Sequence, residues 1–173
     1  MKRACLLSGG PGVGKTTIIK QAIGNLQGKA GGFFTEEMRS GGARHGFRIV
    51  TLDGQSATLA HIDIKSPYRV SKYGVDMESL DRVGVAALRE ATRECDLVVV
   101  DEIGKMELFS PSFREAVLEA IDSGKRVLGT IMLTSHPWAD RIKRHPNVAI
   151  ISVTRMNQGQ ALEQVLDWLK APN

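Results

Sequence analysis

Near its N-terminus the chain carries the segment Gly9-Gly10-Pro11-Gly12-Val13-Gly14-Lys15-Thr16. It matches the pattern G-x-x-x-x-G-K-[ST] at every fixed position. Glycines let the backbone curl so that its N–H groups face phosphate oxygens. In such a loop Lys15 reaches the β- and γ-phosphates and the Thr16 hydroxyl binds Mg²⁺, and we expect Thr17 to contact the α-phosphate. The segment therefore predicts a site for a Mg²⁺-bound nucleoside triphosphate.

The residues on either side of this loop favour the same interpretation over a chance glycine-rich turn. Residues 4–7 form a short apolar run, which is typical of a strand buried on both faces. After the loop, apolar residues recur at steps of three and four, namely Ile19, Ala22, Ile23 and Leu26. A buried strand followed by an amphipathic helix would direct unpaired N–H groups and a helix dipole at the phosphates.

The rest of the chain alternates between strand and helix patterns. We expect further strands at 32–35, 47–52, 57–60, 97–100, 127–133 and 148–153. We expect further helices near 80–91, with Asp76 as N-cap, and near 111–121, 135–144 and 162–169. Residues 62–75 look irregular, as an ordered surface excursion. The pattern predicts a three-layer α/β phosphate-loop fold, with a mostly parallel sheet and an antiparallel hairpin over 47–60 at one edge.

Size and composition are consistent with one domain over residues 1–173. The chain is 42% hydrophobic and 24% charged, which suits a single substantial core. No apolar run approaches the roughly 18 residues that cross a bilayer. The first strand follows the initiator Met closely, which leaves little room for a signal peptide. From these features we expect no membrane partner and a cytoplasmic location.

The charge balance suits an anionic small ligand better than nucleic acid. The formal net charge is +4 and the pI is about 9.2, but the lysines and arginines are scattered rather than gathered on one face. Cys5 and Cys95 lie in or next to apolar elements and are expected to be buried, reduced thiols. The four histidines form no ligand pair at helical spacing, which argues against zinc. The sequence points to no particular protein partner.

A second candidate functional feature is a pair of acidic residues at the end of a predicted strand. The apolar run 97–100 leads into Asp101 and Glu102. Ligands of open α/β sheets bind at the carboxyl ends of strands, so we expect Asp101 to hold Mg²⁺ with Thr16. Glu102 would then orient or deprotonate the water that attacks the γ-phosphate. Lys105 is either a surface lysine or a source of positive charge for the transition state.

Four segments together resemble a specific family. They are GGPGVGKTT at 9–17, GFFTEEMR at 32–39, GFRIVTL at 46–52 and VVVDEIGKMELFS at 98–110. This combination resembles the small nucleoside-triphosphatases known as cancer-related or thermostable NTPases, over nearly the whole chain. The resemblance implies slow hydrolysis of ATP, GTP, CTP, UTP and TTP to the diphosphate and phosphate, with broad tolerance of the base.

The resemblance also implies which residues touch the nucleotide. Besides the phosphate loop, it points to the run Val98, Val99, Val100, Asp101, Glu102, Ile103, Gly104 and Lys105. It strengthens the catalytic assignment of Glu102 and Lys105 beside Lys15. It further draws attention to Thr35, Glu36 and Arg39 as accessory residues. Arg39 either reaches the γ-phosphate or forms a plain ion pair at the sheet edge.

Two departures from the family bear on base preference. Met132 follows Gly129-Thr130-Ile131 where a proline is usual, and Met156-Asn157-Gln158 stands where Glu-Asn-Arg is usual. A small-molecule kinase and a nucleotide-operated switch are alternative functions. A kinase of this size would be expected to carry an arginine-bearing lid, for which 62–75 is the one candidate. The chain contains no Asn-Lys-x-Asp motif, so a strictly guanine-specific switch is disfavoured.

Overall fold

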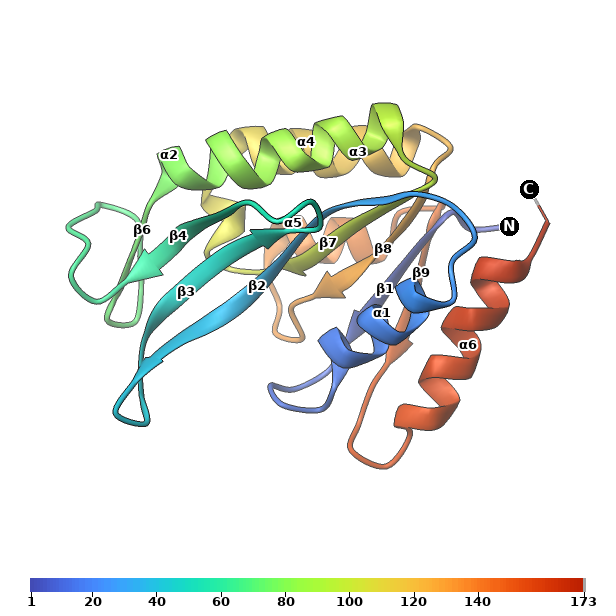
Figure 1. Cartoon of the computed structure of the whole chain (residues 1–173), viewed down its shortest axis with the longest axis horizontal. Coiled ribbons are helices and arrows are strands. Elements are labelled where there is room, and N and C mark those ends of the chain that lie inside the picture. The colour runs from blue at the N-terminus through green and yellow to red at the C-terminus, as the bar shows by residue number, and fades with distance from the viewer. Residues whose placement is uncertain (173) are drawn as a thin grey trace.

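The structure, a computed structural model, describes residues 1–172 and is built on a nine-stranded sheet (Figure 1). The strand order across the sheet is β5-β6-β4-β3-β2-β7-β8-β1-β9. The strands are β1 (Ala4–Ser8), β2 (Ala30–Ser40), β3 (Ala43–Thr51), β4 (Ser56–His61), β5 (Arg69–Val70), β6 (Tyr73–Val75), β7 (Leu97–Ile103), β8 (Arg126–Ile131) and β9 (Val148–Ser152).

The sheet has two parts, which we call the parallel half and the antiparallel half. In the parallel half, the strands β2, β7, β8, β1 and β9 pair in parallel with one another. In the antiparallel half, β3, β4, β6 and β5 continue the sheet from β2 with alternating direction. The predicted α/β class, with an antiparallel edge on a parallel sheet, is confirmed. The antiparallel half is larger than the predicted hairpin because residues 62–75 contribute β5 and β6.

Helices cover both faces of the sheet and make the three predicted layers (Figure 1). The helical segments are α1 (Lys15–Gly24), α2 (Met77–Ser79), the π-helical segment η1 (Leu80–Val85), α3 (Ala86–Glu94), the 3₁₀ turn η2 (Glu107–Phe109), α4 (Pro111–Asp122), α5 (Pro137–Lys143) and α6 (Gln158–Lys170). Helices α3 and α4 pack together on one face, and α1 and α6 pack together on the other. Each face buries its own apolar cluster, because the central strands are apolar on both sides.

Side chains form the N-caps of α2 and α4, the first of them at Asp76 as predicted. The Asp76 carboxylate accepts a hydrogen bond from the Ser79 N–H at 3.0 Å. The Ser110 hydroxyl accepts one from the Phe113 N–H at 3.0 Å, with Pro111 in the first turn of α4. The Ser110 cap fixes the end of the segment that joins β7 to α4.

Several elements differ in length from the expectations. Strand β2 is longer than 32–35, because its outer residues are paired with β3 although they are polar and exposed. Strand β8 ends at Ile131 rather than at residue 133, so Met132 and Leu133 belong to the following loop. Cys5 and Cys95 are free and buried, as predicted. Among residues 1–172, no helix has the length and apolar character needed to span a membrane.

Candidate active site

The phosphate loop joins the end of β1 to the start of α1, as the sequence predicts. Gly14 stands at the N-cap of α1 with a φ of 98°, a left-handed conformation that favours glycine. A Cβ on Gly9 would lie 2.3 Å from the Val153 carbonyl oxygen, so only glycine allows the loop to leave β1 so close to β9. Within residues 1–172 no side chain caps the first turn of α1. Its N–H groups are therefore donors for an anion.

Lys15 is the cation of this loop. Its ammonium group donates hydrogen bonds to the carbonyl oxygens of Gly9 and, at 3.2 Å, of Gly10. These bonds keep the charge beside the backbone donors rather than in open solvent. A lysine held there can reach phosphate oxygens that bind at the same loop.

Asp101 is buried at the carboxyl end of β7 and is held by hydroxyl groups from three elements. Thr16 donates to one carboxylate oxygen at 2.6 Å, and Thr130 donates to the other at 2.7 Å. Thr35 donates to the Asp101 carbonyl oxygen at 2.7 Å. Burial raises the pKa of the Asp101 carboxyl, while the bonds from Thr16 and Thr130 oppose that rise. The arrangement joins the phosphate loop to the strand end through one fixed carboxylate.

Glu102 follows Asp101 and faces the same cavity. The peptide bond between these two residues is cis, and the register of β7 against β8 shifts between Val100 and Ile103. Burial is the largest cause that raises the pKa of Glu102, the charge of Asp101 adds to it, and Lys15 lowers it. An acid with a raised pKa beside a phosphate-binding loop is a candidate general base.

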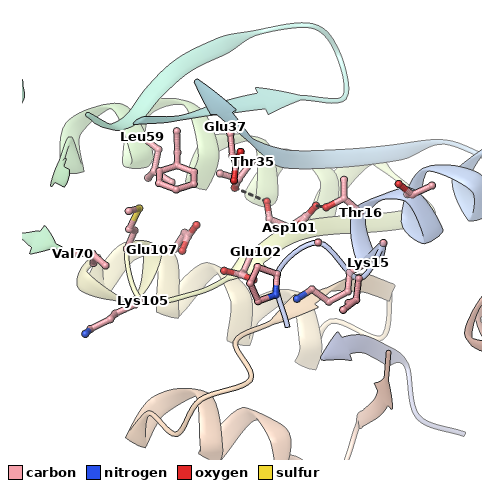
Figure 2. Close-up of a pocket in the computed structure, with 17 residues that line it drawn as sticks. Lys15, Thr16, Thr35, Glu37, Leu59, Val70, Asp101, Glu102, Lys105 and Glu107 are labelled. Atoms are coloured by element: carbon pink, nitrogen blue, oxygen red, sulfur yellow. Dashed lines mark hydrogen bonds between the residues drawn. The ribbon is translucent and has the colours of Figure 1, made fainter. Parts of the chain in front are cut away.

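The cavity that contains these groups has a volume of about 550 Å³ (Figure 2). On one side it is lined by the phosphate loop and the strand-end acids, through Pro11, Gly12, Val13, Gly14, Lys15, Thr16, Thr17, Thr35, Asp101 and Glu102. On the other side it has an apolar wall made of Phe47, Leu59, Val70 and Met106, with Glu37, Lys105 and Glu107 beside it. This volume lies in the usual range of small-molecule sites.

Glu107 is a site residue that the sequence reasoning did not single out. It lies in η2, is 4% exposed, and lines the cavity near Glu102 (Figure 2). Burial raises the pKa of Glu107 to about 8, and the charge of Glu102 adds to the rise. An acidic residue in the apolar run Met106-Glu107-Leu108-Phe109 is the one sequence signal that could have marked it.

The structure does not bring the accessory residues Glu36 and Arg39 to the cavity lining. Arg39 forms an exposed ion pair with Glu37 at 2.7 Å and donates to the Gly42 carbonyl at 3.1 Å. The Oε2 atom of Glu36 lies 3.7 Å from the Nε atom of Arg48 on the neighbouring strand. Of the two interpretations of Arg39, this geometry favours the ion pair at the sheet edge.

The run Val98–Lys105 divides into core residues and cavity residues. Val98, Val99, Val100 and Ile103 are at most 1% exposed, and they belong to the core rather than to the cavity lining. Lys105 lines the cavity but is exposed, and its side chain extends away from Lys15 (Figure 2). The structure therefore gives Lys105 the position of a surface lysine at the cavity rim.

Gln158, at the start of α6, holds the phosphate loop from the far end of the sequence. Its amide nitrogen donates to the Val13 carbonyl oxygen at 2.6 Å. It lies 3.0 Å from the position of a Cβ on Gly14. The sequence marked this residue as a departure from the family, but the contact itself depends on tertiary structure and has no local signal.

The fold and this site define a phosphate-loop nucleotide-binding protein, and comparisons with known proteins make the class more specific. A family model described as NTPase matches residues 4–166. The nucleoside-triphosphatase THEP1 of Thermotoga maritima is 49% identical over 165 residues, which cover 95% of this chain and 94% of that protein. The human cancer-related nucleoside-triphosphatase is 37% identical, with 99% of this chain and 98% of that protein covered. The chain belongs to this NTPase family.

Solved structures of relatives agree with that assignment. The crystal structure of THEP1 from Aquifex aeolicus superimposes with a TM-score of 0.88 at 35% identity, covering 97% of this chain and 99% of that one. The solution structure of a human cancer-related nucleoside triphosphatase gives a TM-score of 0.83 at 35% identity, covering 99% of both chains. The predicted family and fold are thus confirmed by sequence and by structure.

Proposed function

We propose that the chain hydrolyses nucleoside triphosphates to the diphosphate and phosphate in a Mg²⁺-dependent reaction. The observation that carries the proposal is the hydrogen bond from Thr16 to Asp101, because it places the phosphate loop and the strand-end acids in one cavity. The family supports the coarser statement that the enzyme is a hydrolase acting on nucleoside triphosphates. The role of each residue and the metal requirement are part of the proposal.

The residues beside the loop suit Mg²⁺. Mg²⁺ binds oxygen ligands and usually takes one or two protein oxygens besides water and substrate phosphates. The Thr16 hydroxyl and the Asp101 carboxylate are such oxygens, and they already lie 2.6 Å apart. When bound, the ion would neutralise charge on the β- and γ-phosphates. Thr130 and Thr35 would keep Asp101 in place for that task.

The chain's own groups account for the remaining steps. The backbone donors of the loop and Lys15 bind and orient the triphosphate. Glu102 orients a water molecule in line with the γ-phosphate and accepts its proton as the new bond to phosphorus forms. The bond from the γ-phosphorus to the β–γ bridging oxygen breaks in the same step and releases the diphosphate. The raised pKa of Glu102 makes the ionised carboxylate a stronger proton acceptor. Lys105 contributes to this scheme only if its side chain turns toward the phosphates.

The position of the candidate phosphate contacts supports broad tolerance of the base. The donors of the loop are backbone N–H groups and Lys15, which recognise phosphates and not a base edge. The names of the related nucleoside-triphosphatases likewise specify no base. We therefore propose ATP, GTP, CTP, UTP and TTP as substrates. The cytoplasmic location expected from the sequence remains part of the proposal.

The test is phosphate release from each of the five triphosphates, measured with Mg²⁺ and with the metal removed by EDTA. We expect release from all five with rates within about tenfold of one another, and loss of release with EDTA. Strict preference for one base would contradict the proposed tolerance. Release that persists in EDTA would contradict the proposed metal dependence.

One observation favours a second candidate, phosphoryl transfer to a small molecule. The apolar wall formed by Phe47, Leu59, Val70 and Met106 extends the cavity beyond what phosphates need. A kinase would use such space for an acceptor hydroxyl in place of water. Quantitative recovery of the γ-phosphate as inorganic phosphate, without an added acceptor, favours hydrolysis over this candidate.

A further inference from the structure

Two carboxyl groups of the cavity, those of Glu102 and Glu107, both lie close to Gly104. A Cβ placed on Gly104 would lie 2.5 Å from an oxygen of Glu102 and 3.0 Å from an oxygen of Glu107. Glu102 is the next-to-last residue of β7, before Gly104, and Glu107 begins η2 after it. Figure 2 shows both carboxyl groups on the cavity side of the chain between the phosphate loop and the apolar wall. Any side chain at position 104 would push these carboxyl groups apart.

Glu107 lacks the partners that usually accompany a buried acid. Within residues 1–172, no arginine, lysine or histidine forms an ion pair with it, and no side chain hydrogen-bonds its carboxyl group. Its favourable interactions come from the backbone of Glu107 itself and of Gly104. Burying an acid in this way costs free energy that packing alone does not offset. Such groups are typical of functional sites.

The backbone around Glu107 is firmly held, so its side chain has a defined starting point. The Leu108 N–H donates to the Gly104 carbonyl at 3.0 Å, which closes the turn between β7 and η2. The Ser110 N–H donates to the Glu107 carbonyl at 3.0 Å. Ser110 also caps α4 and hydrogen-bonds Asp81 through its hydroxyl group. A rigid backbone on both sides of Gly104 can fix the direction of a neighbouring side chain.

From this geometry we propose that Glu107 is a positioning residue for the reaction. Its buried carboxyl group, held against Gly104, sets the direction in which Glu102 faces the attacking water. Glu107 itself touches neither the phosphates nor the water, and it acts through Glu102. Gly104 has a part in this positioning, because the carboxyl groups of Glu102 and Glu107 occupy the space that a side chain at position 104 would need. The inference rests on the proposed role of Glu102 in hydrolysis.

The test is a double-mutant cycle on ATP hydrolysis with Mg²⁺, comparing Glu107→Leu in two backgrounds. In the otherwise unchanged enzyme, Glu107→Leu should lower kcat about tenfold and leave KM within twofold. In the Glu102→Gln background it should cause no further loss, because the group that it positions is already disabled. Losses that multiply would show that Glu107 acts independently of Glu102, and would overturn the proposal.

Two more variants separate positioning from folding. Glu107→Gln keeps polar oxygen and nitrogen atoms in the same place, so it should retain kcat within about threefold. Gly104→Ala should lower kcat about tenfold with unchanged binding of a fluorescent ATP analogue. If Glu107→Leu does not fold, a normal kcat in Gly104→Ala by itself overturns the proposal. Glu115→Gln is the control, because that acid is exposed on α4, lies outside the cavity lining and pairs with Arg89, and it should change kcat less than twofold.

Failure of the proposed function gives a different result from failure of this inference. Absence of phosphate release from all five triphosphates by the unchanged enzyme would overturn the proposed function. If Glu102→Gln retains full turnover, hydrolysis stands but Glu102 is not the base, and the positioning role of Glu107 falls with it. If Glu102→Gln loses turnover but Glu107→Leu and Gly104→Ala retain it, only the positioning role of Glu107 is wrong.

Discussion

The parallel and antiparallel halves of the sheet contribute different things to one cavity. Each strand of the parallel half that reaches the cavity brings a polar group with a partner, such as Asp101 between Thr16 and Thr130. The antiparallel half brings Phe47 and Leu59, which form part of an apolar wall. Parallel strands all end at the same edge, so polar groups can gather there, whereas antiparallel strands spread their ends over both edges. Chemistry is therefore expected in one half and enclosure in the other.

The largest effect should come from the cation of the phosphate loop. Lys15→Ala should lower kcat/KM for ATP by about 10³-fold, or about 4 kcal/mol, because a preorganised charge beside the phosphates is lost. Phosphate release at several ATP concentrations measures the change. Lys20→Ala, on an exposed turn of the same helix, is the control and should stay within twofold. Full activity of Lys15→Ala would show that hydrolysis does not take place at the phosphate loop beside the parallel half.

The next effect tests the strand-end acid. Glu102→Gln should lower kcat by about 10²-fold, or about 2.7 kcal/mol, with unchanged nucleotide binding, because the water loses its proton acceptor. Single-turnover phosphate release and binding of a fluorescent ATP analogue check the two parts. Normal turnover in this variant would show that Glu102 is not the general base, so that the parallel half would be left with nucleotide binding as its only proposed role.

The pH dependence of stability should reveal the buried acid of the site. The pKa of Glu107 is raised to about 8 in the folded state, against an ordinary value of 4.5. The unfolded chain therefore releases this proton first, and folding stability falls as pH rises from about 4.5 to about 8. Glu107→Gln removes this loss, so its stability relative to the unchanged protein should increase by more than ~1.4 kcal/mol across that range.

Urea unfolding at pH 5, 6.5 and 8 measures this difference. A constant difference across the three pH values would mean that Glu107 is ionised in the folded protein. Glu119→Gln on the exposed face of α4 is the control and should show little dependence on pH. A higher free energy of unfolding in Glu107→Gln would show that this acid destabilises the folded protein. That is expected of a residue kept for function rather than for stability.

A smaller effect is expected from the core of the antiparallel half. Ile49 is fully buried in β3 and packs beneath η1 without lining the cavity. Ile49→Val should lower the free energy of unfolding by about 0.5–1.5 kcal/mol and leave kcat within twofold at 25 °C. Urea unfolding and phosphate release on the same preparation check both parts. A large loss of kcat would show that the antiparallel half does more than enclose the site.

The smallest effect is expected at the tip of the β2–β3 hairpin. Arg39→Ala removes an exposed ion pair with Glu37, which contributes less than ~1 kcal/mol. The KM for ATP should change by less than twofold, as measured by phosphate release. A tenfold rise in KM would favour the other interpretation, in which Arg39 reaches the γ-phosphate.

The sequence predicted what depends on neighbours along the chain. The phosphate loop, the strand before it and the helix after it form a local unit, so its pattern sufficed. The acids after the apolar run 97–100 followed from the rule that parallel strands end at one edge. The outer part of β2 escaped prediction because Glu36, Glu37 and Arg39 are polar and exposed. Their strand conformation comes from pairing with β3, which a local pattern does not show.

The remaining site residues depend on contacts between distant segments. Thr130 on β8 donates a hydrogen bond to Asp101 on the adjacent strand β7. Gln158, from the other end of the chain, donates one to the Val13 carbonyl oxygen. Neither belongs to a pattern that single-sequence reasoning can detect. Glu107 lay within the segment that suggested the family, but its burial beside Gly104 and Glu102 became visible only in three dimensions.

The position of β1 in the sheet has a consequence for the order of synthesis. This first strand pairs with β8 and β9, whose residues lie more than a hundred positions later. A ribosome therefore releases the phosphate loop long before the segments that flank β1 have been made. We expect a nascent chain stopped before residue 148 to bind ATP poorly, and competence to arise once β9 has been made rather than progressively.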